Sequence, residues 1–170
     1  MSLTREIKGK NVRRNNKYND VVSLLVYGDI DGESRSDRVI FNAIKDLIVF
    51  AAMVGKKYER LEEVDGPSST GIILDTFAGS STSGSKGSRV DQHNLIFMLG
   101  LLHFKDINSI RDNGVDEVID IFEKYSNGGL SLIKEWLVES GWNPLVLLDK
   151  ISDELARDNA GGIIIDESPF

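Results

Sequence analysis

The sequence predicts a mostly α-helical fold: a single compact helical domain of five to six helices with a minor two-stranded β-ribbon. Residues 39–54 and 91–104 are apolar on nearly all sides, which is typical of helices buried in a core. Residues 115–137 instead repeat their apolar side chains at helical spacing, as amphipathic helices do. Only 71–77 and 162–166 are short and rich in β-branched residues, so strands are few. A chain of 170 residues suits one domain with a sizeable core.

The helices expected in the first part of the chain end at glycines. Residues 18–27 hold a short apolar run before Gly28, for which we favour a helix over a strand. The buried helix at 39–54 is followed by Gly55, a residue that commonly ends helices. We expect the helix at 91–104 to be the second strongly buried one.

Residues 115–137 predict two amphipathic helices joined by a tight turn. The turn is Ser126-Asn127-Gly128-Gly129, because Asn and Gly accept the left-handed conformation that ends one helix and lets the next begin. The apolar stripes of the two helices comprise Val115, Val118, Ile119, Phe122 and Tyr125, and then Leu130, Ile133 and Leu137. This pair is expected to be a packing unit of the domain.

A last helix and the β-ribbon complete the predicted fold. Asn143 followed by Pro144 is a start signal, since it supplies an N-cap side chain and a proline at the first helical position. The stripe of this helix comprises Leu145, Leu148, Ile151 and Leu155. The similar segments GIILD at 71–75 and GIIID at 162–166 are expected to pair as the ribbon.

Composition excludes several classes of protein. Apolar residues make up 41% and charged residues 28% of the chain, an ordinary globular balance rather than a disordered one. Without cysteine, disulfides and thiolate metal sites are excluded. No apolar stretch is long enough for a membrane span, and the first residues lack the apolar core of a signal peptide. A cytoplasmic location is therefore expected.

The net charge of −7 is unevenly distributed. Residues 1–17 carry a net charge of +5, which leaves −12 for residues 18–170. We therefore expect a basic, flexible arm at 1–17 and a single helical domain at 18–170, with a Gly/Ser-rich loop at 78–88. An arm of this kind either aids solubility or contacts phosphates of DNA. The candidate DNA contacts are Arg5, Lys8, Lys10, Arg13, Arg14 and Lys17.

The glycine-rich segment at 79–86 is the nearest approach to a phosphate-binding loop. It lies between a predicted strand and a predicted helix, but Ser85 precedes Lys86, the reverse of the Gly-Lys-Ser/Thr order that such a loop requires. A surface loop is the better interpretation. Similarly, residues 29–33 contain alternate acidic side chains but lack the glycine and glutamate positions of a calcium loop, so we expect a turn there.

No catalytic, metal-binding or cofactor-binding residue is predicted. The two histidines, His93 and His103, are ten residues apart on one predicted helix and cannot bind one metal directly. Each is expected at a helix end or partly buried. The chain also lacks the Gly-x-Ser-x-Gly pattern of a nucleophilic serine.

Two segments carry a resemblance to a known family. These segments agree in residue types, order and spacing with the recurring motifs of that family. They are residues 121–137, IFEKYSNGGLSLIKEWL, and residues 45–57, KDLIVFAAMVGKK. On these residues the chain resembles the DNA phosphorothioation (Dnd) system-associated protein 4 family, over about residues 18–142. We refer to the two segments below as the motif segments.

The resemblance implies a non-catalytic accessory or adaptor protein of a bacterial DNA phosphorothioation modification and restriction (defence) system. Such a protein acts through contacts with other proteins of the system, and contact with DNA through the arm is a further expectation. The expected partner surface comprises Trp142, Glu123, Lys124 and Lys134. The alternatives left open are a small enzyme, nucleotide-dependent or nuclease-like, and a structural homo-oligomer.

Overall fold

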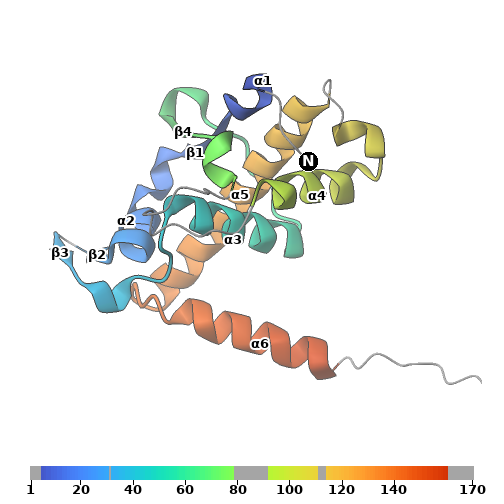
Figure 1. The fold of residues 1–170 in the computed structure, drawn as a ribbon. Coiled ribbons are helices and arrows are strands. Elements are labelled where there is room, and N and C mark those ends of the chain that lie inside the picture. The colour runs from blue at the N-terminus through green and yellow to red at the C-terminus, as the bar shows by residue number, and fades with distance from the viewer. Residues whose placement is uncertain (1–4, 31, 79–91, 111–113, 161–170) are drawn as a thin grey trace, which may run out of the picture.

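A computed structural model describes residues 5–30, 32–78, 92–110 and 114–160, and it confirms the mostly α-helical fold (Figure 1). The longer helices pack around one apolar core, to which all of them contribute buried side chains. Within the described ranges, no helix has the length and apolar content needed to cross a membrane. The elements are α1 (Arg5–Lys8), β1 (Asn11–Asn15), α2 (Asn19–Tyr27), β2 (Asp29–Ile30), β3 (Glu33–Ser34), α3 (Ile44–Lys57), β4 (Ser69–Ile73), α4 (His93–Phe104), α5 (Val115–Glu139) and α6 (Val146–Ala160).

The central element is α5, one continuous helix of 25 residues. The predicted turn at 126–129 is therefore wrong: the turn residues lie in the middle of this helix, and all four are buried. The physical reason is the close crossing of α5 and α3. A Cβ atom on Gly129 would lie 1.8 Å from the carbonyl oxygen of Ala51, and one on Gly55 would lie 2.0 Å from that of Tyr125. The glycines thus serve close packing of two helices rather than a chain reversal.

The helices on either side of this crossing largely follow the predictions. The apolar run at 18–27 is helical, and Gly28 ends α2 in the left-handed conformation. In α3 most of the apolar side chains are buried, as predicted, but the helix begins at Ile44 rather than at residue 39 and continues through Gly55, which was expected to end it, to Lys57. However, α4 is buried on one side only, because Met98 and Leu102 are 47% and 57% exposed.

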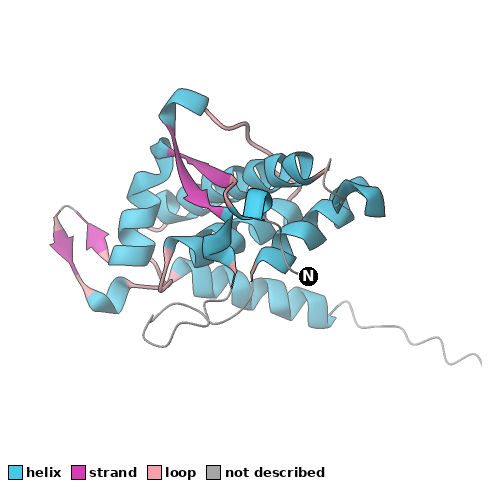
Figure 2. Cartoon of the chain, turned by 45° about the horizontal axis from the view of Figure 1, so that its top comes forward, coloured by secondary structure: helices cyan, strands magenta, loops and turns pink. Residues whose placement is uncertain are grey.

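The β-ribbon pairs different segments from those predicted. β4 pairs antiparallel with β1, with Val12 opposite Ile72, while the predicted partner at 162–166 lies outside the described residues. β1 falls in the segment predicted to be a flexible arm, yet Val12, Arg14 and Asn15 are buried. The loop predicted at 78–88 lies almost wholly outside the described residues. Figure 2 shows the ribbon and the small β2–β3 hairpin at separate places on the helical body.

The last helix, α6, lies along one side of the body (Figure 1). As predicted, the Asn143 side chain precedes it, and its Oδ1 accepts a hydrogen bond of 3.1 Å from the Leu145 amide. Leu147 is buried against the core. The apolar residues predicted for its buried stripe remain largely exposed: Leu145 by 53%, Leu148 by 51%, Ile151 by 39% and Leu155 by 59%.

Candidate functional site

Two polar side chains of α5 hold the first strand on the helical body. Glu123 accepts hydrogen bonds from the backbone N–H of Arg13 at 2.7 Å and from its guanidinium at 3.0 and 3.2 Å. Asn127 accepts from the backbone N–H of Asn15 at 2.8 Å and donates to the carbonyl oxygens of Arg13 and Glu123. We call Glu123 and Asn127 the strand clamp. Both belong to the motif segment at 121–137, which therefore has a structural role.

The clamp corrects one predicted partner residue. Glu123 is only 1% exposed, so it presents no surface to a partner. Burial raises the pKa of its carboxyl above the usual value, although the hydrogen bonds from Arg13 act in the opposite direction. The pKa of the Arg13 guanidinium is raised in turn by its hydrogen bond to Glu123.

A carboxyl whose pKa is raised by folding gives a testable pH dependence. The folded state holds the Glu123 proton to higher pH than the unfolded state, so the contribution of this group to stability falls as pH rises above 4.5 through the folded pKa. We expect wild type to lose stability relative to Glu123→Gln over that window. Urea unfolding of both proteins at several pH values checks this. A wild-type advantage that grows with pH would contradict the raised pKa.

A second polar cluster lies where α3, α4 and α5 meet. The Tyr125 hydroxyl lies 3.0 Å from Nδ1 of His103, 3.3 Å from a carboxylate oxygen of Glu59 and 3.5 Å from Nζ of Lys56. Lys56 and Glu59 also pair at 2.7 Å, which raises the pKa of Lys56 and lowers that of Glu59. Because these groups bind one another across three elements, the cluster ties the ends of α3 and α4 to α5. His103 stands in the last turn of α4, as predicted for a helix-end histidine, and the buried His93 begins the same helix.

The predicted basic arm is engaged with the rest of the molecule. Lys8 pairs with Asp75 at 3.3 Å and Lys10 with Asp116 at 2.6 Å, and Lys17 pairs with Glu62 at 3.0 Å. Arg13 is bound by the strand clamp. Arg14 is buried and donates to the side chain of Asn19, and burial lowers its pKa. The side chain of Arg5 lies outside the described residues. Contact with DNA through these six residues stays a prediction, and it would compete with the ion pairs.

The other residues of the predicted partner surface are spread along α5. Lys124 pairs with Glu63 and Asp120, each at 3.0 Å. Lys134, ten residues further and so about 15 Å along the helix, pairs with Asp20 at 2.6 Å. Trp142 lies beyond the end of the helix, partly buried against the core. The structure therefore does not bring these side chains together into one surface.

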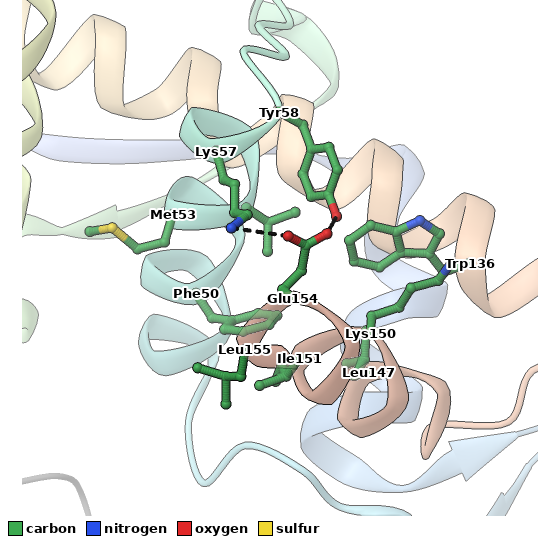
Figure 3. A pocket seen from close by; sticks show the side chains of 11 residues that line it. Phe50, Met53, Lys57, Tyr58, Trp136, Leu147, Lys150, Ile151, Glu154 and Leu155 are labelled. Atoms are coloured by element: carbon green, nitrogen blue, oxygen red, sulfur yellow. Dashed lines mark hydrogen bonds and ion pairs between the residues drawn. The ribbon is translucent and has the colours of Figure 1, made fainter. Parts of the chain in front are cut away.

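An apolar groove lies between α3, α5 and α6 (Figure 3). Its volume is about 230 Å³. The lining residues are mostly apolar, with a few polar ones at the rim: Phe50, Met53, Val54, Lys57, Tyr58, Trp136, Leu147, Lys150, Ile151, Glu154 and Leu155. We call this the α6 groove. The groove was not predicted from the sequence, because it forms where three helices distant along the chain meet.

The polar groups of the α6 groove are bound to one another. Glu154 accepts a hydrogen bond of 2.7 Å from the Tyr58 hydroxyl and pairs with Lys57 at 3.0 Å, as Figure 3 shows. The Tyr58 bond and the Lys57 pair lower the pKa of Glu154, so this carboxyl is not a general acid at neutral pH. The Lys150 ammonium lies 5.5 Å from the centre of the Trp136 ring. The arrangement fits a binding surface better than a catalytic site.

Among the residues that the structure describes, no three His, Cys, Asp or Glu side chains are grouped so as to hold a metal ion. The glycine-rich segment at 79–86, the nearest candidate for phosphate binding, lies outside the described residues.

A comparison with known protein families found a match over most of the chain. The family model described as DNA sulphur modification system-associated protein 4 matches residues 11–162. This range contains both motif segments, the strand clamp and the α6 groove. Searches of curated proteins and of solved structures found no match.

Proposed function

The chain belongs to the DNA sulphur modification system-associated protein 4 family, and we propose that it acts in such a system as a non-catalytic accessory protein that binds other proteins. The family description associates its members with DNA sulphur modification. The α6 groove is the observation that carries the proposal of protein binding. It combines an apolar floor with largely exposed aliphatic side chains on α6, the pattern of a surface that a partner covers.

The chemistry of the groove indicates what kind of segment fits it. Trp136 and Phe50 supply large apolar contact area, and Trp is enriched among residues that dominate binding energy. Lys57 and Lys150 line the groove together with the single carboxylate of Glu154, which pairs with Lys57 and, outside the lining, with Arg157. An apolar segment followed by acidic residues is therefore complementary in both shape and charge.

This proposal is favoured over the two alternatives by specific features. Both polar clusters described above join secondary-structure elements to one another, and none of their side chains lines the α6 groove. A structural homo-oligomer remains an outcome that the experiments below distinguish.

A pair of matched variants tests the groove. Leu155 in the groove and Leu102 on α4 are the same residue type, with 59% and 57% exposure. We expect the wild-type chain to copurify with at least one modification or restriction protein of its own system when they are co-expressed. Leu155→Asp is expected to weaken that binding by at least about tenfold, because it places a charge on an apolar contact. Leu102→Asp is expected to bind as wild type does.

Two outcomes of this experiment would contradict the proposal. Equal binding by wild type and Leu155→Asp would remove the groove from the interface. Failure of every protein of the system to copurify with the wild-type chain would overturn the accessory role itself. Melting temperatures of both variants, measured by circular dichroism, confirm that they are folded.

A further inference from the structure

We propose that the segment following α6, residues 163–167 with the sequence Ile-Ile-Ile-Asp-Glu, folds back and occupies the α6 groove in the isolated chain. A partner then has to displace this segment before it binds. Displacement by a partner rests on the function proposed above. Occupation of the groove by the segment concerns the isolated chain alone.

The chemistry of the segment matches that of the groove. Three consecutive isoleucines provide aliphatic side chains for the apolar floor, and Asp166 and Glu167 follow at once. The groove offers the complementary groups. Leu155 and Ile151 are exposed apolar side chains, and Lys57 and Lys150 place ammonium groups at the rim. Docking removes apolar surface of both segment and groove from water and brings opposite charges together.

The length of the segment also suits the distance. α6 ends at Ala160, and Gly161 and Gly162 follow, residues whose conformational freedom permits a reversal of the chain. Leu155 lies about 7.5 Å and Lys150 about 15 Å back along the helix from Ala160, from the rise per residue. A segment of five extended residues spans about 17 Å. A chain returning antiparallel to α6 therefore brings the isoleucines beside Leu155, and the acidic Asp166 and Glu167 toward Ile151 and Lys150.

Disulfide trapping in the full chain tests this placement, since the chain has no cysteine of its own. The test protein carries Met53→Cys, on the α3 side of the groove, together with Ile164→Cys. The control protein carries Asp153→Cys, an exposed position on α6 outside the groove lining, with the same Ile164→Cys. Both are oxidised with glutathione disulfide, and the products are separated by non-reducing electrophoresis.

Docking predicts an inverted order of rates. An undocked segment is tethered closer to position 153 than to position 53, so it would react faster in the control protein. We expect the test pair to form an intrachain disulfide at least about tenfold faster than the control pair, because docking raises the effective concentration of the two thiols. Adding Leu155→Asp to the test protein is expected to remove the advantage. If Met53→Cys fails to fold, Val54→Cys on the same helix replaces it.

Two results would overturn the proposal. A faster reaction in the control pair would show that the segment does not occupy the groove. A disulfide between two chains, with dimer mass, would assign the groove to a second copy instead. Either result leaves the copurification experiment unaffected, so failure of this inference and failure of the proposed function are distinguishable.

Discussion

Replacing Gly129 with Ala is expected to lower the free energy of unfolding by about 3 kcal/mol, the upper end of the usual cost of overpacking. On an exposed helix the same change would stabilise by about 1 kcal/mol, since Ala is the better helix former. The sign is reversed here because the new methyl group would lie 1.8 Å from the Ala51 carbonyl oxygen. That atom belongs to the backbone of α3, so only a separation of the two helices relieves the clash.

Gly100 provides a matched helical control. A Cβ atom there would meet the side chain of Val118 at 2.7 and 2.8 Å, and a side chain moves more easily than a backbone. We expect Gly100→Ala to cost about 1 kcal/mol, clearly less than Gly129→Ala. Urea unfolding followed by circular dichroism measures both. A Gly129→Ala protein as stable as wild type would mean that α3 and α5 cross at a greater distance than the structure has them.

The same glycines explain why the centre of the fold was mispredicted. Ser-Asn-Gly-Gly satisfies every local rule for a helix-ending turn, and local rules contain no information about α3. What decides is the backbone of Ala51 and Gly55 on the facing helix, whose close approach excludes any side chain on Gly129. By contrast, the end of α2 at Gly28 and the position of Asn143 just before α6 were predicted correctly, since both residues act on neighbours in sequence.

The strand at 11–15 shows a second limit of the same kind. Its arginines indicate a basic arm when charges are counted along the chain. However, Glu123 and Asn127 stand one helical turn apart beside the apolar stripe of α5, and such a polar pair is a detectable sign of a buried polar contact. The partner strand, more than a hundred residues away, was not detectable. The α6 groove depends likewise on three helices meeting, so only the exposed stripe of α6 was visible in sequence.

Replacing Asn127 with Ala is the second change expected to be severe, at about 3 kcal/mol. Asn127 is fully buried, and its amide group makes three hydrogen bonds to backbone groups. Without it, the N–H of Asn15 loses its acceptor in a buried place, and an unsatisfied buried donor costs about 1–3 kcal/mol. Asn127→Asp keeps the acceptor and the shape but loses both donated bonds. We expect it to be at least as destabilising at neutral pH, because the carboxylate would face the carbonyl oxygens of Arg13 and Glu123.

Asn108→Ala is the matched control, because Asn108 is exposed and its side chain donates to the nearby Asp106 carboxylate at 2.9 Å. Its cost should stay below about 0.5 kcal/mol. Urea unfolding gives the stabilities, and amide hydrogen exchange of residues 11–15 shows whether β1 detaches before the helices unfold. A cost for Asn127→Ala as small as that of the control would mean that the strand clamp does not hold β1. If Asn127→Ala lowers the free energy of unfolding by the expected amount, Asn127 of the motif segment at 121–137 is needed for folding. Binding to other proteins of the system must then depend on residues outside that clamp, and the α6 groove, with Leu155 and Ile151 exposed, supplies such residues.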